Sequence, residues 1–457
     1  MSAVRAARGR VLVVGAGPAG AAAALAAAAR GAEVTVVERA FAGGNAVAHS
    51  LLPSKVRIAA ARDLAAAAGW GAPAGVAAGG VLAHLRWRRE AARAALEARL
   101  AQAGVTLRSG AALRFEGPGR AHVAAPGGER EVAFDAAVVA TGSAARLPAG
   151  LRPDGRRVLL SRDLATLADL PARAVVVGAG PTGVEIASLL SLAGAGVTLV
   201  GRGRELLPGE DAALTADLGA SLAARGVEMR LGREAQAYEP GEEGVTVVLA
   251  GGERLRADAL FVATGRRGET EGLGLDRLGT APDGAGYLAV DGRGATSAPG
   301  LFAAGDVTGP PLVANKAARQ GAVAGAWAAR SAGGRADPEP PRLDPSTLPV
   351  AVFAQPEYAR VGAVPGREGY EVVEGDDREG LRPHVSGLLG WSARLRLAVD
   401  GEGRVAGAAL LGDGAAEGIL ALAAAVAWRM PLARLGDLVP VVPSAGEALA
   451  ALVADGI

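Results

Sequence analysis

Two glycine-rich turns carry the clearest chemical signal in this sequence. They are Gly15-x-Gly17-x-x-Gly20 and Gly178-x-Gly180-x-x-Gly183. Glycines at this spacing allow a tight turn and a close backbone approach to a pyrophosphate, which binds at the N-terminus of the following helix. Two such turns predict two bound dinucleotides.

Other reactive side chains are scarce. The chain has no cysteine, which excludes disulfide chemistry, thiolate nucleophiles and cysteine-ligated metals. Its four histidines, His49, His84, His122 and His384, stand far apart without the spacing of metal ligands. We therefore expect no metal site.

The elements that must position the first turn are readable from the sequence. Arg10–Val14 is a short apolar run that predicts a strand, and an alanine-rich helix follows the turn. A second strand, Glu33–Val37, ends on Glu38, whose carboxylate can accept hydrogen bonds from the adenosine ribose. The uncharged stretch Val11–Ala29 resembles a membrane span, but its glycines and alanines indicate a buried strand, turn and helix. We expect a cytoplasmic protein without membrane insertion.

The second turn is preceded by the apolar run Ala174–Val177, and its second strand is expected at Val197–Val200. An NAD-selective module presents an acid at the end of that strand. Here the position is Gly201, and Arg202 and Arg204 follow. Because two arginines can bind a 2′-phosphate, we predict NADPH as the electron donor, with NADH possible.

The two modules share more than their glycines. Gly127-Gly128-Glu129-Arg130 precedes an Ala140-Thr141-Gly142 turn, just as Gly251-Gly252-Glu253-Arg254 precedes Ala263-Thr264-Gly265. This internal repeat predicts two similar domains with similar accessory hairpins. Between the modules, Arg86–Ala103 is expected to form an amphipathic helix with Trp87 in a packing role.

Composition fits binding of small molecules. The 457 residues allow about three domains. The formal net charge is +1, from 48 basic and 47 acidic residues. This balance argues against nucleic acid or anionic membranes as partners.

A third stretch resembles a motif of a known family. It runs from Gly43-Gly44-Asn45-Ala46 to Leu51-Leu52-Pro53-Ser54-Lys55. The flavoprotein disulfide reductases, such as dihydrolipoamide dehydrogenase and glutathione reductase, have Gly-Gly-x-Cys, four residues, then Cys-x-Pro-Ser-Lys. Their two redox cysteines fall on Ala46 and Leu51 here. The resemblance covers nearly the whole chain and identifies a cysteine-less member of the class I pyridine nucleotide-disulfide oxidoreductases.

The resemblance implies an α/β fold with two Rossmann-like dinucleotide-binding domains and a C-terminal α+β dimerisation domain. We expect an FAD-binding domain at 1–148, an NAD(P)-binding domain at 149–268, the return of the FAD-binding or central domain at 269–342, and a dimerisation domain at 343–457. Four prolines between Arg335 and Pro345 indicate a linker before the last domain. The implied assembly is a homodimer.

The implied cofactors are FAD and NAD(P)H. FAD is expected at Gly15, Gly17, Gly20, Glu38, Gly43, Gly44, Lys55, Thr141, Gly142, Ser143, Asp306 and Ala314. The nicotinamide dinucleotide is expected at Gly178, Gly180, Gly183, Glu185, Arg202, Arg204 and Gly265. In the family, the lysine at the Lys55 position lies by flavin N5 and pairs with a glutamate, here Glu185. We expect these two residues to serve hydride transfer.

The family's acid–base histidine is also missing. Relatives end with His-Pro-x-x-x-Glu, whereas this chain has Val442-Pro443-Ser444-Ala445-Gly446-Glu447. The loss of both cysteines and this histidine makes disulfide reduction physically implausible. Ala46, Leu51 and Val442 would instead line a small apolar substrate pocket.

This pattern is similar to family members that act as NAD(P)H:quinone reductases, so we expect electrons to pass through FAD to a quinone-like acceptor or dye. A soluble pyridine nucleotide transhydrogenase is the first alternative. A catalytically silent FAD-binding protein is the second.

Overall fold

The structure is a computed structural model that describes residues 9–69, 78–125, 127–148, 150–241, 244–333, 338–380 and 392–454. The chain divides into two compact units. Unit 1 contains Met1–Pro53, His84–Arg146 and Arg266–Asp344, and unit 2 contains Ser54–Ala83, Leu147–Gly265 and Pro345–Ile457. The four domain boundaries expected from the sequence stay predictions.

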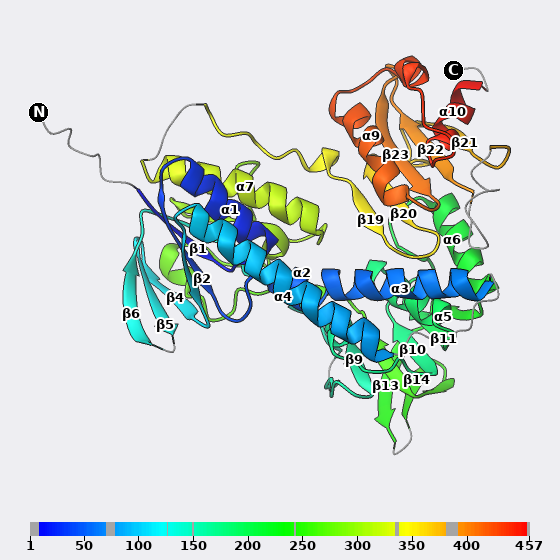
Figure 1. The fold of residues 1–457 in the computed structure, drawn as a ribbon, viewed down its shortest axis with the longest axis horizontal. Coiled ribbons are helices and arrows are strands. Elements are labelled where there is room, and N and C mark those ends of the chain that lie inside the picture. The colour runs from blue at the N-terminus through cyan, green and yellow to red at the C-terminus, as the bar shows by residue number, and fades with distance from the viewer. Residues whose placement is uncertain are drawn as a thin grey trace, which may run out of the picture. The chain divides into compact units, whose positions relative to one another are not determined.

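Unit 1 is built on a five-stranded parallel sheet. Its order is β18 (Leu301–Ala303), β7 (Ala136–Val139), β1 (Arg10–Val14), β2 (Glu33–Glu38) and β3 (Thr106–Ser109). Side chains alternate between the faces of a strand. Val11 and Val13 therefore face helices α1 (Pro18–Ala29) and α7 (Ala314–Ser331), whereas Leu12 and Val14 face a three-stranded meander. The meander consists of β4 (Ala112–Gly117), β5 (Arg120–Ala125) and β6 (Gly128–Ala133), drawn in cyan in Figure 1.

Helices α1 and α7 lie side by side (Figure 1). Their backbones approach so closely that a Cβ added at Gly321 would lie 2.0 Å from the carbonyl oxygen of Ala19. A Cβ at Gly325 would lie 2.1 Å from the carbonyl oxygen of Ala23. The small residues of both helices therefore set the distance between them.

Three helices follow β2, namely α2 (Gly44–Ala48), α3 (Leu51–Gly69) and α4 (Ala78–Gln102). The last one is longer than the Arg86–Ala103 segment expected from the sequence. Trp87 is 59% exposed, so the packing role expected for it is limited to the surface of the helix and does not extend into a core. Its ring instead contacts His84 and the guanidinium of Arg88 on the helix surface.

Unit 2 repeats the plan of unit 1. Its parallel sheet has the order β12 (Val227–Leu231), β11 (Gly196–Gly201), β10 (Arg173–Val177), β16 (Ala259–Val262) and β9 (Val158–Leu160). Helices α5 (Pro181–Leu192) and α6 (Ala212–Ala224) accompany it, with a meander of β13 (Ala235–Pro240), β14 (Val245–Leu249) and β15 (Arg254–Ala257). Because β10, β11 and β16 occupy the places of β1, β2 and β7, the predicted internal repeat is confirmed.

The rest of unit 2 is an antiparallel sheet with helices. The sheet order is β19 (Val350–Val352), β20 (Tyr358–Gly362), β23 (Val405–Leu411), β22 (Arg394–Val399) and β21 (Glu371–Asp376). Helices α9 (Ala415–Ala427) and α10 (Glu447–Ala454) pack on it. We call this part the C-terminal sheet domain.

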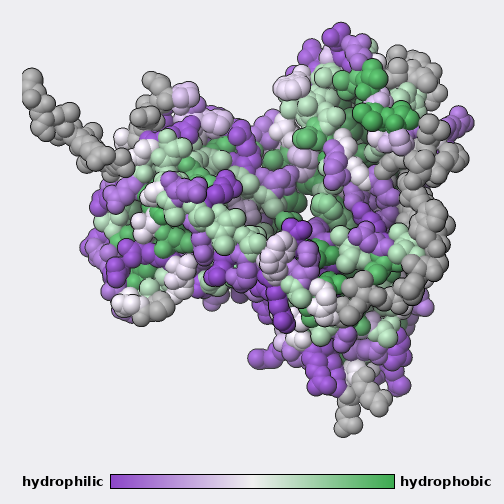
Figure 2. All heavy atoms as spheres, in the orientation of Figure 1, coloured by the Kyte–Doolittle hydropathy of each residue, from purple (hydrophilic) through white to green (hydrophobic). Residues whose placement is uncertain are grey.

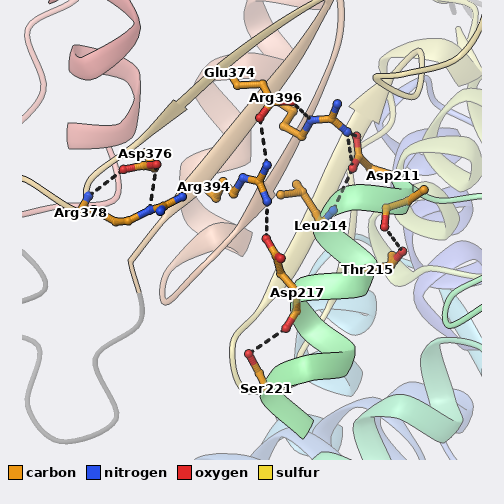
Figure 3. A network of polar contacts seen from close by, with 11 residues as sticks. Asp211, Leu214, Thr215, Asp217, Ser221, Glu374, Asp376, Arg378, Arg394 and Arg396 are labelled. Atoms are coloured by element: carbon orange, nitrogen blue, oxygen red, sulfur yellow. Dashed lines mark hydrogen bonds and ion pairs between the residues drawn. The ribbon is translucent and has the colours of Figure 1, made fainter. Parts of the chain in front are cut away.

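Ion pairs fasten this domain to α6 (Figure 3). Arg396 of β22 contacts the buried carboxylate of Asp211 at 2.6 Å, and that carboxylate also accepts the amide of Leu214 at the start of α6. Arg394 bridges Asp217 and Glu374 at 2.5 and 3.0 Å. Buried charges that are paired and hydrogen-bonded fix the geometry between the elements they join.

Short elements complete the fold. Strands β8 (Ser143–Ala145) and β17 (Arg266–Gly268) form a two-stranded antiparallel pair. The 3₁₀ turns are η1 (Ser161–Ala165), η2 (Leu275–Leu278), η3 (Gly305–Thr308), η4 (Pro345–Thr347) and η5 (Leu432–Asp437). Among the helices described, none is long and apolar enough to cross a membrane.

Candidate functional site

The first glycine turn forms a cradle at the N-terminus of α1. Gly15 has φ +103°, and a Cβ there would lie 2.4 Å from the carbonyl oxygen of Ala140, so only glycine fits. Gly17 begins the helix without a side-chain cap. The N–H groups of the first helical turn are therefore available to an anion such as a pyrophosphate.

Two neighbouring groups complete the cradle. The buried carboxylate of Glu38 accepts the amides of Ala16 at 2.7 Å and Ala40 at 2.8 Å, which fixes it at the end of β2. Gly44 approaches the turn so closely that a Cβ on it would lie 2.9 Å from the Cα of Gly17. The structure thus brings the predicted FAD-binding residues of this region together, and their shape fits a dinucleotide.

A second cluster in unit 1 is centred on Ser143, which is buried. Its hydroxyl donates to Asp306 Oδ2 at 2.7 Å and accepts from Arg266 Nε at 2.7 Å. Its carbonyl oxygen accepts from Asn45 Nδ2 at 3.1 Å. One residue therefore joins the glycine loop, strand β17 and the turn that carries Asp306. Sequence reasoning missed both Asn45 and Arg266, because Asn45 occupies the unspecified position of the Gly-Gly-x-Cys motif and Arg266 lies just beyond the Ala263-Thr264-Gly265 turn.

Helix α7 holds the Asp306 turn from the other side. Gln320 Oε1 accepts the amide of Gly305 at 2.9 Å and the Thr308 hydroxyl at 3.0 Å. Lys316 Nζ donates to the carbonyl oxygen of Gly309. Burial lowers the pKa of Lys316, and the nearby carboxylate of Asp306 opposes that shift. The predicted residue Ala314 begins this helix.

One further observation supports a ligand in this region. The hydroxyl of Thr141 is buried and has no hydrogen-bond partner among the residues described. Buried hydroxyls are usually satisfied. Thr141 belongs to the set predicted to bind FAD, and it precedes Gly142 and Ser143 in the turn after β7. The donor set of unit 1 therefore fits FAD.

Asp306 offers a direct test of this cluster. We expect Asp306→Ala to weaken FAD binding about 10-fold or more, because a hydrogen bond to a charged group is worth roughly 1.5–3 kcal/mol. Quenching of flavin fluorescence during titration of apoprotein with FAD measures the change. Asp291→Ala serves as a control, because Asp291 caps an exposed turn of the same unit. Equal affinity in Asp306→Ala and wild type would contradict the role given to this carboxylate.

The second glycine turn has the same geometry as the first. Gly178 has φ +125°, and a Cβ there would lie 2.1 Å from the carbonyl oxygen of Ala263. A Cβ at Gly183 would lie 1.7 Å from the carbonyl oxygen of Gly178. Gly180 begins α5 without a side-chain cap, and Gly265 follows β16 with φ +106°. This turn therefore fits a second pyrophosphate.

The end of β11 differs from the end of β2. Gly201 replaces the acid, and a Cβ there would lie 2.9 Å from both the Cβ of Ala179 and Cδ2 of Leu231. Arg202 and Arg204 follow with exposed side chains. Within the described part of the chain, neither guanidinium is paired with a carboxylate. Two uncommitted cations at this position fit a phosphate group.

Unit 2 also contains an ion pair between Lys55 on α3 and Glu185 on α5. Lys55 Nζ lies 2.6 Å from Glu185 Oε2, with side-chain exposures of 26% and 16%. The other oxygen, Glu185 Oε1, accepts the backbone amide of Phe353 at 2.9 Å. The Phe353 ring centroid lies 4.5 Å from Lys55 Nζ. The pairing expected from the resemblance is present, whereas the contact with Phe353 was not foreseen.

The three residues expected to line a substrate pocket do not all belong to one unit. Ala46 lies in α2 and Leu51 begins α3, and both are in unit 1. Val442 belongs to unit 2 and is 52% exposed. The pocket therefore stays a prediction. Glu447 has a structural role, since its carboxylate accepts the amide of Ser444 at 3.0 Å before α10.

The histidines are dispersed. His84 accepts from Arg88, and His122 lies 3.3 Å from Glu129, while His49 ends α2. His384 lies outside the described residues. No cluster of three potential ligands for a metal is found in the described ranges.

Comparison with known proteins agrees with this architecture. Residues 9–321 match the family model described as pyridine nucleotide-disulphide oxidoreductase. The chain is 32% identical over 454 residues to a dihydrolipoyl dehydrogenase of Chlorobaculum tepidum, covering 96% of this chain and 94% of that protein. It is 32% identical over 455 residues to a glutathione reductase of Burkholderia cepacia, covering 96% of each chain.

A solved structure of the same kind covers almost the whole fold. The crystal structure of LpdA from Mycobacterium tuberculosis is 29% identical, with a TM-score of 0.87 over 98% of this chain and all 100% of that one. The chain belongs to the pyridine nucleotide-disulphide oxidoreductase family. It is an FAD-dependent pyridine nucleotide oxidoreductase with two Rossmann-like domains and a C-terminal α+β domain.

Proposed function

We propose that this protein passes electrons from NADPH through FAD to a quinone-like small molecule, without a redox disulfide. The observation that carries the proposal is an asymmetry between the two halves of the reaction. The Lys55–Glu185 pair is present at 2.6 Å, whereas no cysteine exists anywhere in the chain. The residues expected to serve reduction of the flavin by NADPH are present, whereas the cysteines that would pass electrons to a disulfide are absent.

The residues can be given roles in the overall reaction NADPH + H⁺ + quinone → NADP⁺ + hydroquinone. FAD, when bound, supplies a carrier of two electrons between donor and acceptor. Glu185 orients the Lys55 ammonium, because its Oε2 lies 2.6 Å from Lys55 Nζ. Ala46 and Leu51 offer only apolar surface, which suits a flat, weakly polar acceptor and provides no partner for thiol exchange.

The relatives' names indicate disulfide or lipoamide substrates, so the acceptor is the point to test. We expect NADPH oxidation by the holoenzyme with a naphthoquinone, and none above background with lipoamide or oxidised glutathione. NAD⁺ belongs in the same panel, because fast reduction of NAD⁺ by NADPH would favour a transhydrogenase. Turnover of lipoamide would overturn the proposal.

We propose NADPH as the donor because of Gly201, Arg202 and Arg204. An acid at position 201 alone would be strained, since its Cβ would lie 2.9 Å from the Cβ of Ala179. We expect the double variant Ala179→Gly/Gly201→Glu to shift the ratio of kcat/KM for NADPH and NADH by roughly 100-fold toward NADH. The new carboxylate repels a 2′-phosphate and accepts the ribose hydroxyl.

Two variants control this switch. Gly201→Glu alone should lose stability as well as NADPH affinity, because the clash with Ala179 remains. Ala179→Gly alone should keep the donor preference. If wild type already prefers NADH, the assignment of Arg202 and Arg204 is wrong.

We propose a homodimer formed through the C-terminal sheet domain. Hydrophobic side chains are exposed on this domain at Leu420, Trp428 and the segment Leu438–Val442, where Val439 is 93% exposed. Figure 2 shows green, hydrophobic spheres on the surface of this domain, at the upper right. Large exposed apolar patches mark protein–protein interfaces. We expect sedimentation at the mass of two chains, and Val439→Asp with Val441→Asp should give monomers. A wild-type protein that sediments as a monomer would contradict this assembly.

A further inference from the structure

We propose that Phe353 is a positioning residue for the Lys55–Glu185 pair during electron transfer from the nicotinamide. This inference rests on the proposed function. The ring of Phe353 covers the Lys55 ammonium at 4.5 Å, and its backbone amide donates to Glu185 Oε1 at 2.9 Å. One residue therefore holds both members of the pair, the cation through its ring and the carboxylate through its main chain.

The chain around Phe353 is fastened to α5 in a regular way. Glu185 and Ser188 lie one helical turn apart, and they accept the amides of Phe353 and Gln355 at 2.9 Å each. The amides of Phe353 and Gln355, two residues apart, therefore both donate to the same face of α5. Because Ser188 and Gln355 are fully buried, this second bond is protected from water. The segment cannot slide along α5 without losing both bonds.

The carbonyl groups of the segment are held as well. Arg62 of α3 donates to the carbonyl oxygen of Ala354 at 3.4 Å, and Arg225 donates to that of Gln355. Arg62 also pairs with Glu357 at 3.1 Å. Helix α3, which carries Lys55, is thus tied to the same segment as α5, which carries Glu185. Phe353 therefore lies in a segment that is hydrogen-bonded to both helices.

The ring contributes more than apolar contact. A cation over an aromatic face is attracted by the ring quadrupole, and the attraction grows when water is excluded. With Glu185 on one side and the ring on another, the flexible lysine chain keeps few other positions for its ammonium. A misplacement of a reacting or orienting group by about 1 Å can lower a rate by roughly 100-fold.

The composition of the chain allows a direct spectroscopic test. It contains only two lysines, Lys55 and Lys316. Holoenzyme labelled with ¹³Cε-lysine should give two signals, and Lys316→Arg assigns them. We expect the Lys55 εCH₂ protons to be shifted upfield by the ring in wild type and in Phe353→Tyr. In Phe353→Leu that shift should vanish while the Lys316 signal stays in place. An unchanged Lys55 signal in Phe353→Leu would overturn the contact.

A kinetic experiment measures the binding of NADPH and the reduction of the flavin separately. In anaerobic single-turnover reduction by NADPH, we expect Phe353→Leu to lower the limiting rate about 5-fold without changing the Kd of NADPH. Phe353→Tyr should retain the wild-type rate. Phe134→Leu is the matched control, because it removes a buried ring from the core of unit 1.

The results of these experiments test the role of Phe353 and the proposed function separately. A wild-type rate in Phe353→Leu, with normal reduction of the wild type, overturns the role of Phe353 alone. A change in Kd with an unchanged limiting rate also overturns it, because it would indicate a binding contact. Failure of the wild type to be reduced by NADPH or NADH overturns the proposed function and this inference together.

Discussion

Glu185→Gln is expected to slow reduction of the bound flavin by NADPH about 100-fold, while FAD stays bound. The glutamine keeps the size of the side chain and can still accept the amide of Phe353, but it no longer pairs with the charge of Lys55. The ammonium then loses its partner at 2.6 Å. Displacement of such a group costs rate more than affinity. Anaerobic stopped-flow absorbance at the flavin band measures the limiting rate and the Kd of the nucleotide separately.

A matched control separates this effect from a general loss of negative charge. Glu228→Gln removes an exposed carboxylate from strand β12 of the same unit, where its partner is Arg230. Exposed ion pairs contribute little to stability. We expect wild-type reduction in this control. If Glu185→Gln reduces its flavin as fast as wild type, the pair has no part in the reaction.

Gly325→Ala is expected to give a large loss of stability, comparable with that of Gly321→Ala in the same helix. Its Cβ would lie 2.1 Å from the carbonyl oxygen of Ala23, and backbone atoms of α1 cannot move aside singly. Overpacking of a close contact costs roughly 1–3 kcal/mol or more. Because α1 carries the first glycine turn, FAD affinity should fall together with the melting temperature. Thermal unfolding with and without added FAD tests both effects.

The same substitution elsewhere provides the control. Gly79 lies near the start of α4, and nothing lies within 4 Å of a Cβ built on it. An alanine in an exposed helix is favoured over glycine by roughly 0.5–1 kcal/mol. Gly79→Ala should therefore keep or raise the melting temperature. Equal behaviour of Gly325→Ala and Gly79→Ala would show that α1 and α7 are not in close contact.

Features that depend on local geometry could be predicted from the sequence. Both glycine turns lie where expected, because left-handed backbone and close approach leave no choice but glycine at positions such as Gly15 and Gly178. Strands β1 and β10 begin within a residue of their predicted starts. The repeat of the flanking segments also predicted that the two parallel sheets would share one plan.

Features that depend on long-range contacts could not be predicted. Phe353 lies in a run of apolar residues that is typical of a strand, and nothing in that run indicates a lysine from α3 above its ring. Arg266 and Ser143 are more than 100 residues apart. Trp87 is exposed although tryptophan is usually well buried. In each case the partner is chosen by tertiary packing, which single-sequence patterns do not encode.

The residues that this chain shares with the family motifs do not all have the same kind of contact. Lys55 and Glu185 remain in contact, so they can still act together. Glu447 remains in the terminal segment too, although Val442 has replaced the histidine. The carboxylate of Glu447 accepts a hydrogen bond from the backbone amide of Ser444. This hydrogen bond gives the acid a structural role at the start of α10.

Anaerobic stopped-flow reduction of the FAD-loaded protein tests the central claim most directly. With NADPH followed by a naphthoquinone, we predict rapid bleaching of the flavin without a long-wavelength thiolate–flavin band, then rapid return of the oxidised spectrum. Lipoamide or oxidised glutathione in place of the quinone should leave the flavin reduced. Reoxidation by a disulfide, or a flavin that neither NADPH nor NADH can bleach, would contradict the account.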